Sequence, residues 1–249
     1  MVGGAGGTGR PVVGQTDLRS VTLTDRGKAF ASHVVDILAQ VQTARLAVQT
    51  EMRTGTLRVS VPVPMGRMLA GPVIAEFRRR LPGVYLEIKL QNRRVDLVKD
   101  GLDVAIVAGS LADSELIARK LTAAGMWLYA SARFEAEADA ARTASIPFIA
   151  APGDAALIQR SRVVVALDPP VAVVDDRTAV ADALVWGAGA GLLPSFLGEP
   201  ACAQGKLVRL HAEPIATLPV YALYHASQRG DPRLQVLIDE IARQLNNVL

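Results

Sequence analysis

The sequence predicts an α/β protein of two lobes, and three observations support this fold class. The chain has 249 residues, half of them hydrophobic, which is enough to bury a sizeable core. Short apolar runs of strand type alternate with amphipathic helical stretches from residue 55 onward. The alternation occurs first in 55–109 and again in 126–226. Such alternation is typical of a parallel, doubly wound sheet with helices on both faces.

A long helix is expected before the first lobe, over residues 24–52. Thr24 is a good N-cap residue, and Asp25 follows at the positive end of the helix dipole. The apolar residues that recur at spacings of four and three are Phe30, Val34, Ile37, Val41, Ala44 and Val48. A mean spacing of about 3.5 residues is the seam along which two helices pack. We interpret this seam as a dimerisation surface; the alternative is an ordinary helix lying on its own domain.

The first lobe is expected to begin after Gly55 with a strand. Leu57, Val59 and Val61 alternate with polar residues there. The helix that follows has an apolar face made by Leu69, Val73 and Phe77. The expected elements are a strand at 56–61, a helix within 62–83, a strand at 84–91, a short helix at 93–101 and a strand at 103–109.

The second lobe repeats the pattern. The expected elements are a strand at 126–131, a helix at 132–142, a strand at 146–151, two extended runs within 163–174, a helix at 178–189, and strands at 191–196, 206–210 and 218–226. Asp175 or Asp176 can cap the helix at 178–189, which we favour over a pair of carboxylates for acid–base work. A last helix at 231–245 presents one apolar face, made by Leu234, Leu237, Ile238, Ile241 and Leu245.

Several classes of protein are disfavoured by composition. The net charge is +3 and basic residues are interspersed with acids, whereas phosphate-gripping domains concentrate positive charge on one face. Cys202 is the single cysteine, so the chain has no intrachain disulfide and no cysteine zinc site. No apolar run approaches the roughly 20 residues of a membrane span, and the N-terminus has no apolar core of a secretory signal. We expect a soluble, cytoplasmic protein.

No catalytic, metal or cofactor site is expected. The histidines at 33, 211 and 225 do not share the short helical spacing of a metal pair. Cys202 has no neighbouring histidine that would lower its pKa. The glycine-rich GAGAG at 187–191 follows a helix and precedes a strand, the reverse of the order in a dinucleotide site.

A ligand site is expected beyond the carboxyl ends of the strands, where loops expose backbone N–H groups and helix starts. Arg67 and Arg177 can each hold a carboxylate through two hydrogen bonds, the alternative for each being a solvated surface charge. The helix starts and these arginines favour an anionic small molecule. The residues placed at this edge are Pro64, Met65, Gly66, Arg67, Asn92, Ala108, Gly109, Asp176 and Arg177.

These residues resemble a known family. RSVTLTDRG at 19–27 resembles the wing end and linker start of LysR-type transcriptional regulators, through Leu23, Thr24 and Gly27. Residues 55–109 are similar to the start of the family's effector-binding domain, the pattern R-x-V-D-L-V-x-x-G-x-D-x-A-I at 94–107 being the most specific part. Residues 173–197 resemble the later helix–strand–proline stretch. The likeness covers about 18–249.

The resemblance implies a fold like that of type 2 periplasmic binding proteins: two Rossmann-like lobes joined by crossover strands near 125 and 220. It implies a cytoplasmic homodimer or tetramer, dimerised partly through linker helices. It puts the effector loops at Pro64 to Arg67, Asn92, Ala108 to Gly109 and Asp176. The first loop departs from the family, which often has a hydroxyl where this chain has Pro64 and Met65.

The expected domains are a disordered glycine-rich tail at 1–16, a wing remnant and linker helix at 17–54, and an effector-binding domain at 55–249. Lobe I is expected at about 55–125 and 222–249, and lobe II at about 126–221. Glycine disfavours helix by roughly 1 kcal/mol per residue, so residues 1–16 do not supply a helix-turn-helix. DNA is the expected partner of intact members of the family. For this chain we expect a regulator that senses a small molecule but does not itself read DNA. The alternatives are a solute-binding protein and an enzyme on the same fold.

Overall fold

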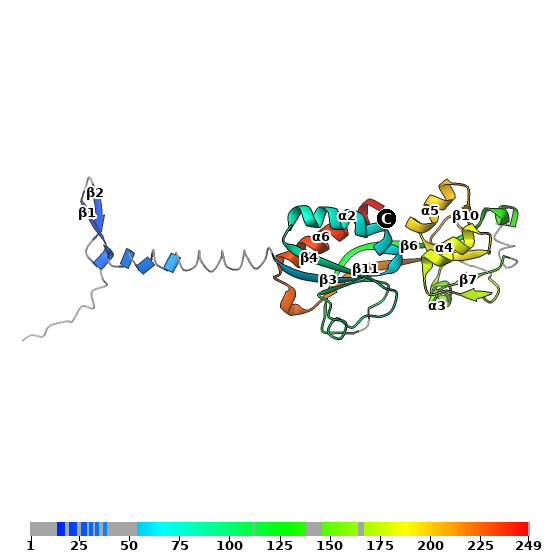
Figure 1. The fold of residues 1–249 in the computed structure, drawn as a ribbon, viewed down its shortest axis with the longest axis horizontal. Helices are drawn as coiled ribbons and strands as arrows, with labels where there is room; N and C mark the ends of the chain where they lie inside the picture. Colours follow the sequence, from blue (N-terminus) through cyan, green and yellow to red (C-terminus); the bar gives the residue numbers. More distant parts are fainter. Residues whose placement is uncertain are drawn as a thin grey trace, which may run out of the picture. The chain divides into compact units, whose positions relative to one another are not determined.

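The computed structural model describes residues 14–17, 20–23, 26–28, 30, 31, 33, 34, 37, 38, 54–111, 113–137, 146–163 and 167–248. The chain divides into two compact units, Met1–Met52 and Arg53–Leu249. Figure 1 gives the labels of the helices and strands.

The first unit contains a β-hairpin and helical residues. Strands β1 (Gly14–Asp17) and β2 (Ser20–Leu23) pair antiparallel, with Gly14 opposite Leu23. Residues 14–16 therefore belong to a strand, which corrects part of the disordered tail predicted for 1–16. The reason is that a strand needs a partner: the β-branched Val21 and Thr22 belong to the partner strand, which composition at 1–16 does not reveal. The rest of that predicted tail lies outside the described residues.

The predicted linker helix lies partly within the described residues. Positions 26–28, 30, 31, 33, 34, 37 and 38 are helical. Phe30 and Ile37 on the predicted seam are 62% and 59% exposed, and Val34 is partly buried. Val41 and Val48 lie outside the described residues.

The described part of the second unit has a seven-stranded mixed sheet. Its strands are β3 (Gly55–Val61), β4 (Val84–Leu90), β5 (Val104–Ala108), β6 (Ile117–Ser131), β9 (Ala190–Pro194), β10 (Leu207–Arg209) and β11 (Ala216–Tyr224). The order is β10-β6-β11-β5-β3-β4, and β9 also pairs with β6. Strand β3 pairs parallel with β4 and β5, whereas β11, β6, β9 and β10 pair antiparallel.

The α/β class is thus confirmed, but the expectation of a fully parallel sheet is wrong. Alternating apolar residues identify a half-buried strand without giving its direction. Parallel neighbours require a crossover connection, usually a helix. No described helix lies between β5 and β6, and β11 enters between these two strands with the opposite direction.

Strand β6 runs through both lobes (Figure 1). Its first part, Ile117–Met126, pairs with β11, and its second part pairs with β9 and β10. The register shifts between Val220 and Tyr221, and such a bulge increases the local twist where the chain passes between lobes. The crossover strands implied near 125 and 220 are present, although β6 begins nine residues before the strand predicted at 126.

Lobe I packs helices α2 (Val63–Arg80) and α6 (Pro232–Val248) on one face of the sheet (Figure 1). The predicted apolar faces of both helices are buried in one core, together with Leu57, Val59 and Val61 from β3. Three arginines, Arg78 to Arg80, occupy the last turn of α2. Positive charge there suits the helix dipole.

Residues 93–101 pack against the opposite face of the lobe I sheet as irregular chain followed by turns at 97–101, not as the predicted helix. The Asp96 carboxylate accepts hydrogen bonds from the backbone N–H groups of Val98 and Lys99. The Asp100 carboxylate accepts from the Asp96 N–H and from the Arg93 guanidinium. Aspartate side chains here compete with the backbone for the helical hydrogen bonds, which explains the loss of the helix.

Lobe II surrounds the second half of β6. Its elements are the 3-10 helix η1 (Ala132–Glu137), strands β7 (Ile149–Ala150) and β8 (Ala172–Val173), and helices α3 (Asp154–Arg160), α4 (Arg177–Val185) and α5 (Ser195–Ala203). Apolar cores lie on both faces, and every residue of β9 is buried between them. A second 3-10 helix, η3 (Ala226–Gln228), follows β11 before α6.

Three predicted elements of lobe II need correction. The described part of the predicted helix 132–142 is a 3-10 helix. Strand β9 ends at Pro194, and the next two residues, which we predicted as strand, start α5. Helices α3 and α5 were not predicted, because they are short and α5 contains Gly198 and Pro200, which lower helix propensity.

Candidate functional site

The start of α2 is capped by a side chain that is distant in sequence. Pro62, its own N-cap residue, makes no side-chain capping bond. The Asn92 Oδ1 atom, just beyond β4, instead accepts the Val63 N–H at 3.0 Å. The N–H groups of a first helical turn have no acceptor within the helix. Because Pro64 has no N–H, few such groups remain in α2, and Asn92 provides the acceptor for one of them.

The start of α4 is capped by Asp176, as the sequence predicted for Asp175 or Asp176. One oxygen of its carboxylate, Oδ1, accepts the N–H groups of Thr178 at 2.7 Å and Ala179 at 3.0 Å. Burial alone raises the pKa of Asp176, but hydrogen bonds from Asn92, Ala179 and Thr178 outweigh burial and hold this pKa below its ordinary value. Asp176 is therefore ionised at neutral pH.

The two capped helices come from different lobes and meet through Asn92. The Asn92 Nδ2 atom donates to the Asp175 carbonyl at 3.1 Å and to Asp176 Oδ2 at 2.9 Å. One carboxamide thus contacts the first turn of α2 in lobe I and the cap of α4 in lobe II. Asn92 and Asp176, two of the predicted ligand-site residues that lie 84 positions apart, are thus joined by a hydrogen bond.

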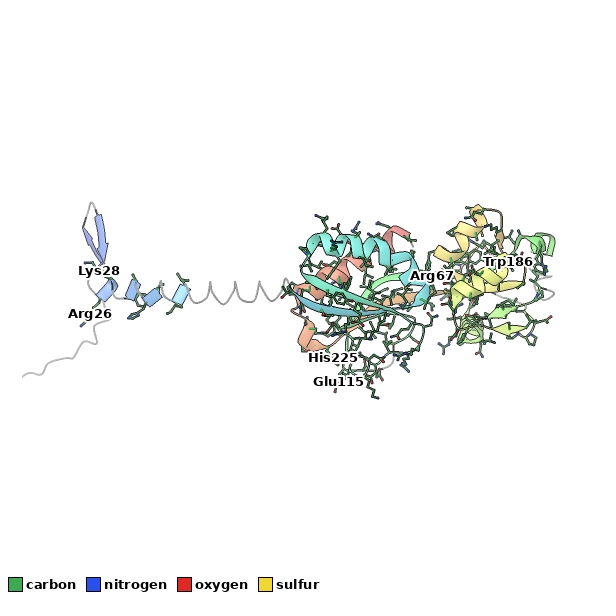
Figure 2. The ribbon with its side chains drawn as sticks, viewed as in Figure 1. Arg26, Lys28, Arg67, Glu115, Trp186 and His225 are labelled. Carbon is green, nitrogen blue, oxygen red and sulfur yellow. The ribbon has the colours of Figure 1, made fainter. Side chains whose placement is uncertain are left out.

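The two predicted arginines have different surroundings. Arg67 is exposed in the first turns of α2, and Figure 2 shows it at the end of lobe I that faces lobe II. Among the described residues, Arg67 has no ion-pair partner. The Arg177 guanidinium instead points into lobe II, where it donates to the Leu192 carbonyl at 2.7 Å and to Asp154 Oδ1 at 2.5 Å.

The remaining predicted residues separate into buried and exposed positions. Pro64, Met65 and Gly66 are buried, and a Cβ at Gly66 would lie 2.1 Å from Leu90 Cδ2, so this glycine lets α2 pack closely on β4. Ala108 is exposed at the end of β5. Gly109 has φ of +102°, which favours glycine, and donates its N–H to the Pro219 carbonyl of β11.

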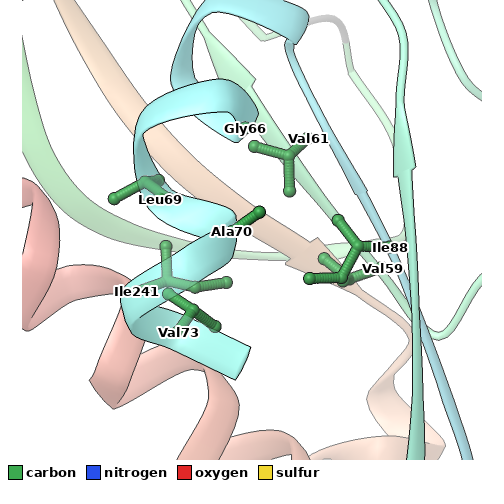
Figure 3. A pocket seen from close by; sticks show the side chains of 8 residues that line it. All are labelled: Val59, Val61, Gly66, Leu69, Ala70, Val73, Ile88 and Ile241. Carbon is green, nitrogen blue, oxygen red and sulfur yellow. The ribbon is translucent and has the colours of Figure 1, made fainter. Parts of the chain in front are cut away.

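Neither Asn92 nor Asp176 lines either of two hollows in the described part of the second unit. Figure 3 shows an apolar gap between β3, β4, α2 and α6, with about 10 Å³ of free volume, close to the size of one water molecule. An open hollow of about 600 Å³ lies over residues 93–100, Glu115, Leu116 and His225. The first hollow is too small for a metabolite.

The sequence interpretation missed Asp154, the buried partner of Arg177. Its side chain is 1% exposed, and its Oδ2 atom also accepts the Ala151 N–H at 2.7 Å. A sequence signal exists: Asp154 follows Gly153 directly at the start of a helical stretch, a position where aspartate is common. Its pairing with a residue 23 positions later has no sequence signal.

Comparison with known proteins settles the family. Residues 50–246 match the family model described as the LysR substrate binding domain. The chain belongs to the LysR family. It is 28% identical to the HTH-type transcriptional regulator CrgA of Neisseria meningitidis serogroup C, over 93% of this chain and 81% of the relative. It is likewise 28% identical to the regulator PtxR of Pseudomonas aeruginosa, over 91% and 77%.

The solved structures agree. The structure of CrgA from Neisseria meningitidis superposes with a TM-score of 0.69 at 25% identity, covering 95% of this LysR-family chain and 85% of CrgA. Full-length AphB of Vibrio cholerae superposes with a TM-score of 0.63 at 22% identity, covering 96% and 84%, which supports the fold. The LysR-family protein is therefore a transcriptional regulator whose second unit is an effector-binding domain of type 2 periplasmic-binding-protein-like fold.

Its relatives are transcriptional regulators, and this sets aside the two alternatives, a solute-binding protein and an enzyme. None of the helices in the described part of this LysR-family chain has the length and apolar content that a membrane crossing requires.

Proposed function

We propose that the regulator responds to a small-molecule effector that binds between its lobes, at Arg67, Asn92, Ala108, Gly109 and Asp176. The observation that carries this proposal is the Asn92–Asp176 hydrogen bond, which brings the starts of α2 and α4 from different lobes to one place. Ends of parallel strands and helix starts are where α/β proteins bind ligands. The exposed Ala108 and the positive-φ Gly109 leave room at the end of β5.

The arginines suggest which groups the effector carries. Arg67 has a free guanidinium for a carboxylate or phosphate, which supports an anionic group on the effector. Arg177 is held by Asp154 and the Leu192 carbonyl, so we assign it a structural role behind Asp176. Pro64, Met65 and Gly66 shape the start of α2 from the buried side rather than contacting the effector with polar groups.

Effector binding would act by shifting the lobe arrangement. A ligand changes a conformational equilibrium only by its different affinity for the two states. A site made of residues from both lobes has this property, because its geometry depends on how the lobes are arranged.

We further propose that the regulator works in the cytoplasm as a homodimer or tetramer. The exposure of Phe30 and Ile37 along a helical seam supports association of two such helices.

The effector proposal is tested by measuring thermal unfolding of the whole chain against a library of small metabolites. A ligand present at 100 times its Kd stabilises the folded state by about 2.7 kcal/mol. Each hit is measured again with Ala108→Trp, which fills the space at the end of β5. The matched control is Val98→Trp, at a 73% exposed position on the turns of residues 93–101.

We expect Ala108→Trp to abolish the stabilisation by a hit and Val98→Trp to preserve it. A hit that stabilises both variants as well as the unsubstituted chain would bind elsewhere and would contradict the proposed site.

A further inference from the structure

We propose that Asn92 is an interlobe latch, and that an effector opens it by presenting its own hydrogen-bond donor to Asp176. This inference rests on the proposed effector site and adds a role for Asn92 beyond ligand contact.

The carboxamide of Asn92 makes polar contacts to both lobes at once. Its oxygen accepts from Val63 in lobe I, and its nitrogen donates to the Asp175 carbonyl and to Asp176 Oδ2 in lobe II. An asparagine side chain has two donor N–H groups, and both have acceptors in lobe II. The carboxamide therefore has a definite orientation, because exchanging its O and N atoms would place N–H against N–H and oxygen against oxygen.

These bonds are the directional side-chain link between the lobes. Among the described residues, no other side-chain hydrogen bond or ion pair joins lobe I to lobe II. The remaining connections are the crossover strands β6 and β11 and apolar packing, such as Phe196 of α5 against the core of lobe I. Apolar packing is not directional, so the two bonds to lobe II fix the separation of the helix starts.

The charge on Asp176 strengthens its hydrogen bond to Asn92 and determines which ligand groups can replace the Asn92 amide. Hydrogen bonds to an ionised acceptor are roughly twice as strong as neutral ones. Burial raises the pKa of Asp176, but its hydrogen bonds outweigh this and keep its carboxylate ionised. Any group that takes the place of the Asn92 amide must be a donor, since a carboxylate or phosphate there would face the Asp176 charge. The effector thus carries an amine, amide or hydroxyl at this end.

The latch is tested by exchanging the hydrogen-bond donor and acceptor between positions 92 and 176. Asn92→Asp retains an oxygen for the Val63 N–H at the positive end of the α2 dipole, but it loses both donors and places a carboxylate against Asp176. Asp176→Asn in the same chain restores a donor–acceptor pair in the opposite sense, and its side-chain oxygen still caps α4. The matched control is Gln91→Ala, which removes the neighbouring amide that bonds Ser60 within lobe I.

The lobe separation is measured in the effector-free full chain by pulsed electron spin resonance. Spin labels are attached at Arg78→Cys on α2 and Gln204→Cys after α5, both exposed positions, in a Cys202→Ser background. We expect Asn92→Asp to reduce the population at the original distance about tenfold relative to displaced populations. We expect the double variant and Gln91→Ala to show the original distance.

Two results would overturn the latch: an unchanged distance in Asn92→Asp, or a double variant displaced as far as Asn92→Asp alone. Asn92→Ser, whose hydroxyl is too short to reach Asp176, gives a second measurement if Asn92→Asp folds poorly. The distances are recorded without effector, so failure of the latch and failure of the ligand screen at Ala108 are distinguishable.

Discussion

The Arg177 guanidinium lies 2.5 Å from the Asp154 carboxylate, with 18% and 1% of the two side chains exposed. The same guanidinium donates to the Leu192 carbonyl of β9. This ion pair ties the start of α4 to α3 and to the sheet of lobe II. It holds the neighbouring Asp176 in place on the side of lobe II that meets lobe I.

We predict that Asp154→Ala and Arg177→Ala each destabilise the protein by about 3–5 kcal/mol, because each leaves a buried charge without its partner. Combining Asp154→Ala with Arg177→Ala should cost much less than the two single losses added, because no charge is then left without a partner. Urea unfolding of the four proteins measures the coupling. Strictly additive losses would show that the pair contributes no mutual stabilisation.

Two helical glycines are predicted to respond to alanine in opposite directions. In α5, a Cβ at Gly198 would lie 2.2 Å from Cζ of the fully buried Tyr129 ring. Gly198→Ala should therefore destabilise by about 1–3 kcal/mol through overpacking. In α2, a Cβ at Gly71 meets no atom within 4 Å other than its two chain neighbours and the nearby backbone of the helix, so Gly71→Ala should stabilise by about 0.5–1 kcal/mol.

Thermal and urea unfolding measure both glycine variants. Equal stabilisation by the two substitutions would mean that α5 moves away from Tyr129 without cost.

Stability is predicted to fall as the solution is acidified through the titration of His211. Burial lowers the pKa of His211 below its ordinary value, so the unfolded chain binds a proton at a higher pH than the folded chain does. The contribution of this group is fully present above about pH 6.5 and is lost as pH falls through the lowered folded-state pKa.

His211→Gln removes this titration. Its unfolding free energy, measured by urea at intervals from pH 7.5 to 5, should decline less steeply than that of the unsubstituted chain. Parallel curves would show that His211 does not contribute to the acid sensitivity.

Association of the regulator is predicted to depend on the helical seam. Ile37→Asp places a charge at a seam position that is 59% exposed in the single chain and would be buried between two helices. We expect the dissociation constant of the dimer to rise at least about a hundredfold. His33→Asp, at an exposed position off the seam, is the control. Sedimentation velocity measures the dissociation constant of each variant. Equal effects of Ile37→Asp and His33→Asp would mean that the dimer contact does not lie along the seam.

Local periodicity predicted the helices and strands whose apolar residues face one core. The faces of α2 and α6 follow a helical spacing that the hydrophobic effect enforces regardless of partner. Local periodicity gave the wrong prediction where side chains compete with the backbone for hydrogen bonds, as Asp96 and Asp100 do at the predicted helix 93–101. It also failed for the first half of β6, whose partly exposed residues alternate weakly.

The candidate site was predicted in part. The rule that ligands lie beyond strand ends selected Asn92 and Asp176, which the structure brings into contact. The same rule selected Arg177, whose side chain points the other way. A rule about strand ends places the backbone, whereas side-chain direction depends on the partner that burial supplies, here Asp154.

The sequence by itself determined the α/β class, the LysR resemblance and the capping of α4, because these depend on residues close together along the chain. The tertiary structure alone decided the antiparallel crossover strands, the inward direction of Arg177 and the double contact of Asn92. Each of these depends on hydrogen bonds or ion pairs between residues far apart in sequence. Their formation is governed by which groups folding brings within about 3 Å of one another, and local patterns carry no information about that distance.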